Sequence, residues 1–151
     1  MFWGVEWLFQ QLQGVLKTEV GYSGGHLSNP SYEKVCQGNT GHLEAIRVVY
    51  NPAEIDFSTI VKYFFEIHDP SQVNRQGPDI GRQYHSAIFY YDEMQKQIAQ
   101  SVMVELEQKT GSKIRTELFP GSVFWPAEEC HQSYYKKTGN QPYCHRYTKK
   151  F

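Results

Sequence analysis

Glu44 has the sequence environment of a general acid. It lies near the start of the segment 42–50, whose β-branched residues predict a strand. Side chains alternate between the faces of a strand, so Glu44 shares an apolar face with Ile46, Val48 and Tyr50. Burial on that face would disfavour the charged carboxylate and raise its pKa, as a general acid requires. The alternative, in which Glu44 turns to solvent at the end of the strand, stays open.

Tyrosines and a second carboxylate lie in or beside two stretches rich in glycine and proline. Long loops are expected there, over residues 23–41 and 71–84. The residues concerned are Tyr22, Tyr32, Asp79 and Tyr84. A tyrosine hydroxyl beside a carboxyl group can polarise a small substrate that carries an oxygen atom. Because the chain has 11 tyrosines, an ordinary surface position for each of them is the alternative.

Three cysteines occur in the chain, and two of them, Cys130 and Cys144, are directly followed by histidine. These two dipeptides could together supply four zinc ligands. Neighbouring side chains on a helix point to different faces, however, so zinc is the weaker hypothesis. Cys130 is expected to pack on a short helix, and Cys36 is expected to be a small buried residue. Cys144 falls in an irregular tail, where its thiol could reach another sulfur.

The composition is that of a globular protein. The chain has 151 residues, 40% hydrophobic and 21% charged, which fits a single domain over residues 1–151. Lys and Arg number 15 against 16 Asp and Glu, so no basic excess predicts binding to nucleic acid or to an anionic membrane. The few cysteines fit a reducing compartment and predict a cytoplasmic protein.

Strand and helix patterns alternate along the chain and predict an α/β or α+β fold of two layers with a mixed sheet. The expected strands cover 15–22, 42–50, 85–91 and 114–118, and the expected helices cover 5–12, 57–65, 92–110 and 126–137. In the first strand, Leu16 is expected on the same face as Val20 and Tyr22. Asp92 predicts an N-cap for the long helix and Gly111 its C-terminal end.

Seven motifs together resemble those of peptide methionine sulfoxide reductases of the A type. They are FWGVE at 2–6, GYSGG at 21–25, NPSY at 29–32, VCQGNTGHLEA at 35–45, HDP at 68–70, RQGPDIGRQYHS at 75–86 and AEECHQ at 127–132. The resemblance covers nearly the whole chain. It implies a ferredoxin-like, two-layer α/β roll that acts as a monomer without metal or organic cofactor. The implied reaction is the reduction of methionine-S-sulfoxide, free or in proteins, with thioredoxin as the reductant.

The resemblance also implies roles for individual side chains. A thiolate at the N-terminus of the first helix would attack the sulfur of the sulfoxide, and Phe2 and Trp3 would form a hydrophobic pocket for the substrate methyl group. Glu44 would protonate the sulfoxide oxygen. Tyr32 and Tyr84 would assist by hydrogen bonding to that oxygen. Asp79, in turn, would shape the pocket by its own hydrogen bonds.

The two sulfur positions that the resemblance implies are Cys144 and residue 1. Cys144 would recycle the enzyme by condensing with a sulfenic acid to give a disulfide, which thioredoxin would reduce. The family pattern has cysteine directly before Phe2, whereas this sequence has Met1, and a thioether cannot act as the nucleophile. The family's first strand is also missing. A fragment, a lost selenocysteine and a pseudoenzyme that only binds methionine sulfoxide each explain this departure.

Overall fold

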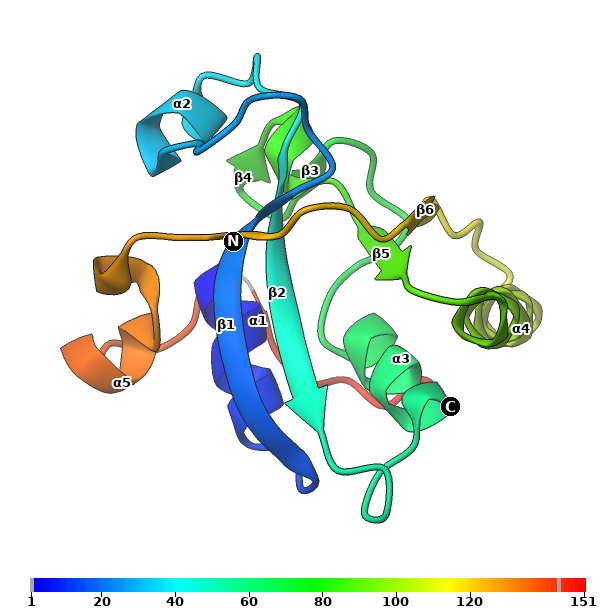
Figure 1. The fold of residues 1–151 in the computed structure, drawn as a ribbon. Helices are drawn as coiled ribbons and strands as arrows, with labels where there is room; N and C mark the ends of the chain where they lie inside the picture. Colours follow the sequence, from blue (N-terminus) through cyan, green and yellow to red (C-terminus); the bar gives the residue numbers. More distant parts are fainter. Residues whose placement is uncertain (1, 144) are drawn as a thin grey trace.

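An antiparallel sheet lies at the centre of the computed structural model, which describes residues 2–143 and 145–151 (Figure 1). Its strand order is β2-β1-β7. β1 (Val15–Ser23) pairs with β2 (Leu43–Tyr50) along its length, and β7 (Trp125–Pro126) pairs with the C-terminal end of β1. The two long strands therefore lie where the sequence predicts them.

Two smaller strand pairs flank this sheet. They are the antiparallel pair β3 (Arg75–Gln76) and β4 (Asp79–Ile80), and the parallel pair β5 (Ala87–Tyr90) and β6 (Glu117–Pro120). Both strand orientations thus occur, as expected for a mixed α/β fold. Figure 1 shows β5 and β6 to the right of β2.

Five α-helices and two short 3-10 helices complete the described fold. They are α1 (Phe2–Gln10), α2 (Tyr32–Cys36), α3 (Phe57–Glu66), α4 (Glu93–Thr110), α5 (Tyr134–Thr138), η1 (Arg82–Tyr84) and η2 (Glu129–His131). α1 packs against β1 and β2, and α3 packs against α4, which gives the expected layer of helices on the sheet (Figure 1). No helix in the described ranges is both long and apolar enough to cross a membrane.

The ends of the long helix follow the predicted capping residues. The Asp92 carboxylate accepts a hydrogen bond from the Gln95 backbone N–H at 2.8 Å. At the other end, Gly111 has φ 69° and donates its backbone N–H to Glu107, which ends the helix in the left-handed conformation that glycine favours.

The structure corrects the sequence-based fold in three places. Leu16 is 66% exposed rather than buried, because the β1–β2 register shifts between Val15 and Lys17. The loop expected over 23–41 contains α2, whose start is capped by the Ser31 hydroxyl. The single helix expected over 126–137 is instead η2 and α5, because Ser133 between them adopts a positive φ of 51°.

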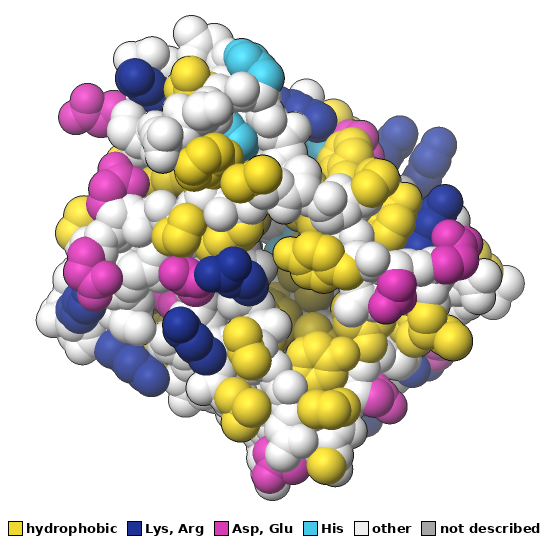
Figure 2. Space-filling view, viewed as in Figure 1, with side chains coloured by type: hydrophobic (Ala, Val, Ile, Leu, Met, Phe, Trp, Pro, Cys, Tyr) yellow, Lys and Arg dark blue, Asp and Glu magenta, His cyan; other side chains and the backbone are white. Residues whose placement is uncertain are grey.

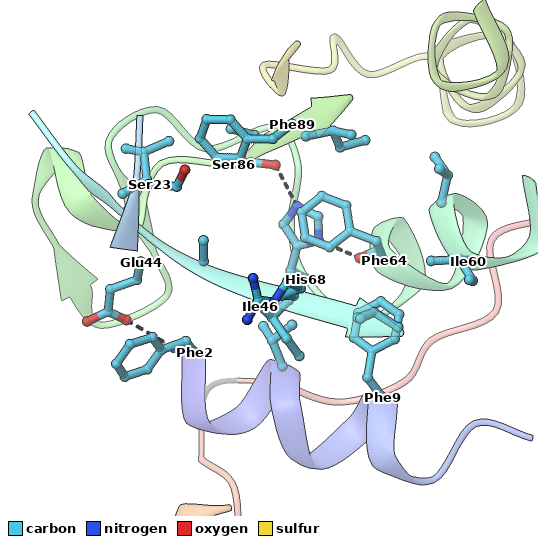
Figure 3. Close-up of a pocket in the computed structure, with 18 of the residues that line it drawn as sticks. Phe2, Phe9, Ser23, Glu44, Ile46, Ile60, Phe64, His68, Ser86 and Phe89 are labelled. Atoms are coloured by element: carbon cyan, nitrogen blue, oxygen red, sulfur yellow. Dashed lines mark hydrogen bonds between the residues drawn. The ribbon is translucent and has the colours of Figure 1, made fainter. Parts of the chain in front are cut away.

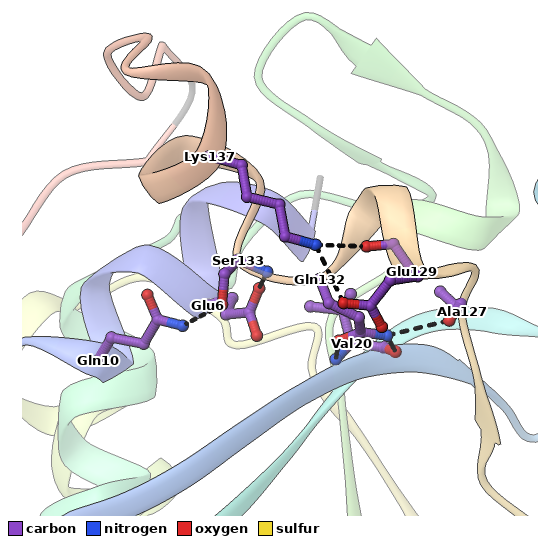
Figure 4. Close-up of polar contacts among 8 residues, drawn as sticks. All are labelled: Glu6, Gln10, Val20, Ala127, Glu129, Gln132, Ser133 and Lys137. Atoms are coloured by element: carbon purple, nitrogen blue, oxygen red, sulfur yellow. Dashed lines mark hydrogen bonds and ion pairs between the residues drawn. The ribbon is translucent and has the colours of Figure 1, made fainter.

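Glu6 is a buried carboxylate that joins three parts of the fold (Figure 4). Only 1% of its surface is exposed. Its Oε2 accepts a hydrogen bond from the Thr18 hydroxyl of β1 at 2.9 Å, and its Oε1 accepts one from the Ser133 backbone N–H at 2.6 Å. Glu6 therefore fixes α1 against β1 and against the segment that leads into α5.

We expect Glu6→Ala to lower the free energy of unfolding by about 2–4 kcal/mol, because it leaves two partly buried donors without this acceptor. Chemical denaturation monitored by circular dichroism measures this loss. Glu19→Ala is the matched control, since Glu19 forms a surface ion pair with Arg47 that contributes about 0–1 kcal/mol. Equal stability of the two variants would contradict the structural role of Glu6.

Candidate active site

Glu44 lies at the start of β2, where its carboxylate meets the N-terminus of α1 (Figure 3). Its Oε1 accepts a hydrogen bond from the Phe2 backbone N–H at 3.0 Å. Its Oε2 is buried and has no hydrogen-bond partner among the described residues. The carboxylate therefore does not turn to solvent, and one of its oxygen atoms is left available.

Burial raises the pKa of Glu44 to about 7, although the hydrogen bond from Phe2 acts in the opposite direction. A cavity of about 360 Å³ adjoins the carboxylate, with walls from α1, β2, α3 and the β5 segment. Hydrophobic side chains surround the hollow between β2 and β5 in the space-filling view (Figure 2), and Phe9, Ile60 and Phe64 are among those that line it (Figure 3). Water is thus replaced by apolar groups on one side of Glu44.

The structure brings all three predicted tyrosines near Glu44, although Tyr22 lies in the core. Burial is the main cause that raises the pKa of Tyr84 to about 12, and the negative charge of Glu44 adds to it. Burial is also the main cause that raises the pKa of Tyr32 well above its usual value. The nearby Cys36 and the negative charge of Glu44 act in the same direction. Tyr22 is fully buried, so the expectation that it lies away from the core is wrong. Its pairing with Glu44 across the sheet directs its ring into the core.

Glu128 links these tyrosines, and the sequence did not single it out. Its Oε1 accepts a hydrogen bond from the Tyr22 hydroxyl at 3.0 Å, and its Oε2 accepts one from the Tyr32 backbone N–H at 3.0 Å. Burial alone would raise the pKa of Glu128, but these bonds hold it below its usual value. A charged Glu128 therefore anchors the start of α2. The sequence feature that could have identified Glu128 is its place in the motif at 127–132.

Phe2 and Trp3, in the first turn of α1, both contact the ring of His131. Phe2 is only 3% exposed and belongs to the core cluster of Tyr22, beside Tyr32. Trp3 is partly exposed and stacks on Tyr134, with ring centroids 3.8 Å apart. The Trp3 indole N–H donates to His131 Nδ1 at 3.1 Å, which fixes the ring plane. The sequence suggested His131 only as a possible zinc ligand and gave Tyr134 no role.

Asp79 connects the site to the C-terminal tail. The Tyr143 hydroxyl donates to both carboxylate oxygens of Asp79, at 3.0 and 3.2 Å. On the other side of residue 144, His145 Nδ1 lies 3.0 Å from the Ile67 carbonyl oxygen. Met1 and Cys144 themselves lie outside the described residues. Both neighbours of Cys144 are therefore held by contacts to the folded domain.

The two described cysteines differ from what the sequence suggests. Cys36 and Cys130 are both free and exposed, so the expected burial of Cys36 is wrong. Cys36 is the last residue of α2, where the helix places it one turn after Tyr32. Within residues 2–143 and 145–151, no three His, Cys, Asp or Glu side chains are grouped to hold a metal ion.

Comparisons with known proteins give a consistent result. Residues 1–151 match the family model described as peptide methionine sulfoxide reductase. Peptide methionine sulfoxide reductase MsrA of Thermus thermophilus is 46% identical over 143 residues, which cover 95% of this chain and 81% of that protein. The MsrA of Methanosarcina acetivorans is 49% identical over 140 residues, which cover 91% of this chain and 74% of that protein.

Solved structures agree with this match. The reduced form of Mxr1 from Saccharomyces cerevisiae superposes with a TM-score of 0.92 and 34% identity, over 98% of this chain and 87% of that chain. Methionine sulfoxide reductase A of Corynebacterium diphtheriae gives a TM-score of 0.82 and 36% identity, over 95% and 73% of the two chains. Mxr1 in complex with Trx2 has the same fold, with a TM-score of 0.66 and 24% identity over 98% and 84%.

The raised pKa of Glu44 predicts a pH-dependent stability. The folded state binds the Glu44 proton more tightly than the unfolded state, in which the Glu44 pKa is about 4.5. The protonated carboxyl group therefore contributes its full stabilisation of the fold below about pH 4.5. It is lost as the pH rises through about 7. We expect Glu44→Gln to stabilise the chain relative to the parent by on the order of 1–3 kcal/mol more at pH 8 than at pH 4.5.

Urea denaturation of parent and variant at both pH values measures this difference. Glu19→Gln is the control, because Glu19 forms a surface ion pair with Arg47 outside the site. A constant difference between the parent and Glu44→Gln would show that the Glu44 pKa is not raised in the folded state.

Proposed function

Because the chain belongs to the peptide methionine sulfoxide reductase family, we propose that the side chains around Glu44 form its catalytic site. The family is an oxidoreductase family, and its reaction is the reduction of methionine-S-sulfoxide to methionine. The observation that carries the site assignment is the buried Glu44 carboxylate with its unpartnered Oε2. The roles of the individual residues below are part of this proposal.

Glu44 is the general acid in this proposal. With a pKa of about 7, a substantial fraction of its carboxyl groups carries a proton at neutral pH. Because Oε1 is occupied by the Phe2 N–H, Oε2 is the atom that can donate to the sulfoxide oxygen. The hydroxyls of Tyr32 and Tyr84 are further donors to that oxygen. Protonation makes the sulfur electrophilic and prepares it for attack by a thiolate.

The attacking sulfur belongs at residue 1. Phe2 is the first described residue of α1, and its N–H already contacts Glu44. A thiol directly before it would lie at a helix N-terminus, which lowers a thiol pKa. The thiolate would attack the sulfoxide sulfur, and the oxygen would pass to the thiol sulfur as a sulfenic acid while methionine is released. Met1 has no thiol proton to lose, so this step requires another residue at that position.

The substrate side chain would be held by aromatic groups and the tail. The face of Trp3, fixed by His131 and Tyr134, is the exposed part of the proposed methyl pocket, and the edge of Phe2 forms its base. Asp79 shapes the pocket by holding Tyr143. Cys144, which follows Tyr143 in the chain, is the recycling thiol in this proposal.

The reductant in this proposal is thioredoxin, as the family resemblance implies; Mxr1, a yeast relative, is described in complex with Trx2. Condensation of Cys144 with the sulfenic acid gives a disulfide and water, and a dithiol then reduces that disulfide. A monomeric, cytoplasmic protein with a single domain over 1–151 completes the proposal. The small number of cysteines, and the free thiols of Cys36 and Cys130, support the cytoplasmic location.

The family match favours the reductase over the alternative of a protein that only binds methionine sulfoxide. We expect the chain with Met1 to show no measurable turnover, because loss of a catalytic nucleophile costs on the order of 10⁶-fold. Met1→Cys, placed behind a strand-forming N-terminal extension that ends in Gly, should reduce the S epimer of methionine sulfoxide and not the R epimer. Turnover by the unmodified chain would contradict the assignment of residue 1.

In the Met1→Cys background, we expect Glu44→Gln to lower kcat by roughly 10²-fold or more, since the amide cannot protonate the sulfoxide oxygen. The limb of the pH–rate profile set by the acid should disappear with it. A stopped assay that separates methionine from its sulfoxide measures both effects. A Gln variant as fast as the parent would remove Glu44 from the mechanism.

In the same background, we expect Cys144→Ser to release one equivalent of methionine and then to stop when thioredoxin is the only reductant. Mass spectrometry should find a sulfenic acid at residue 1 or its adduct with an added thiol. Cys130→Ser is the matched control, because Cys130 is an exposed free thiol with no proposed role. Sustained turnover without Cys144 would mean that another group performs the recycling.

A further inference from the structure

His145 is a buried residue in a tail that is otherwise accessible to solvent. Of the described residues after Tyr135, it alone is buried, with 7% of its surface exposed. Its Nδ1 lies 3.0 Å from the carbonyl oxygen of Ile67, the residue that caps the C-terminus of α3. Its ring also lies against Gly4, in the first turn of α1. His145 therefore connects the tail to the ends of two helices.

Gly4 leaves the space that this ring occupies. A Cβ at Gly4 would lie 2.8 Å from His145 Cδ2 and 3.2 Å from His145 Cβ, which is too close for ordinary packing. Glycine inside a helix is destabilising relative to alanine, and Gly4 has no positive φ that would require glycine. The close approach of His145 is therefore the structural reason for a glycine at this position.

The chain on the C-terminal side of His145 is anchored to the end of α3. The Thr148 backbone N–H donates to the Glu66 carbonyl oxygen at 2.8 Å, and the Lys150 backbone N–H donates to Glu66 Oε2 at 3.0 Å. The Lys150 ammonium donates to two further carbonyl oxygens there, where the helix dipole favours a cation. Figure 1 shows this segment, in red, running from α1 to α3. The position of His145 is thus fixed from its C-terminal side as well.

Gly4 and His145 are close in sequence to the two sulfur positions of the proposed reaction. His145 directly follows Cys144, and Gly4 lies in the first turn of α1, which begins directly after residue 1. Residues 1 and 144 themselves lie outside the described structure. The contact between His145 and Gly4 therefore joins described neighbours of both positions, although these neighbours lie near opposite ends of the chain.

We propose that His145 is a positioning residue for the recycling step, and that its contact with Gly4 holds the tail at the first turn of α1. This inference rests on the proposed function and deepens it. In that step the Cys144 thiol attacks the sulfenic sulfur at residue 1, so an S–S bond replaces the S–O bond and the oxygen leaves as water with the thiol proton. The sulfenic sulfur is reduced as the Cys144 sulfur is oxidised. His145 contributes proximity, because two groups that are held together react much faster than two free ones.

The test follows single turnovers of the Met1→Cys chain with its N-terminal extension, in the absence of thioredoxin. Quenched samples give the methionine released, and mass spectrometry distinguishes the sulfenic acid from the disulfide. We expect His145→Ala to release methionine at the parental rate but to form the disulfide about 10- to 100-fold more slowly. Gly4→Ala should also slow the disulfide step, because the added Cβ displaces the His145 ring.

The double variant that combines Gly4→Ala with His145→Ala tests the contact itself. Because His145→Ala removes the ring that meets the new Cβ, Gly4→Ala should slow the disulfide step no further in that background. Arg146→Ala is the matched control, since Arg146 is the exposed residue directly after His145, and it should form the disulfide at the parental rate.

A parental rate of disulfide formation in His145→Ala would overturn the role of His145 and leave the proposed function intact. Equal slowing of methionine release and disulfide formation would do the same, because it would indicate a general loss of structure. Additive effects of the two substitutions would contradict the contact with Gly4. Absence of methionine release by the Met1→Cys parent would contradict the proposed function, and this inference with it.

Discussion

The hydrogen bond from the Phe2 N–H to Glu44 Oε1 is the contact on which the site depends. It joins the first turn of α1 to the start of β2, two elements that are more than 40 residues apart in the chain. A helix N-terminus favours a negative partner, so the bond is strongest when Glu44 is ionised. Burial has the opposite effect and predominates, which leaves the pKa near 7. The acid is therefore poised between its two forms, with one oxygen already held.

The surroundings of Glu44 explain why such a poised acid costs stability. The cavity beside it replaces water by apolar walls, and its Oε2 has no partner in the described structure. Glu6 on α1 shows the opposite arrangement, because both of its oxygens accept hydrogen bonds from partly buried donors. The Glu6 carboxylate thus stabilises the fold. The Glu44 carboxylate keeps one oxygen without a hydrogen-bond partner, as is typical of a functional group.

The sequence predicts the fold where local rules decide it, and the site only in part. The strands around Glu44 and the ends of α4 follow from alternation and capping, so both were predictable. The burial of Tyr22 and the exposure of Cys36 depend on how β1 and α2 meet distant segments, which no local pattern contains. Gly21 shows the same limit: a Cβ there would lie 2.3 Å from the Trp125 carbonyl oxygen, so its motif reflects close strand packing.

The proposed donors also account for the release of product. An acid Oε2–H and two tyrosine hydroxyls are matched to one strong acceptor, the sulfoxide oxygen. Methionine lacks that oxygen, and its thioether accepts hydrogen bonds only weakly. A site built to hydrogen bond an oxygen therefore binds the product less well than the substrate, because buried donors would be left unpaired.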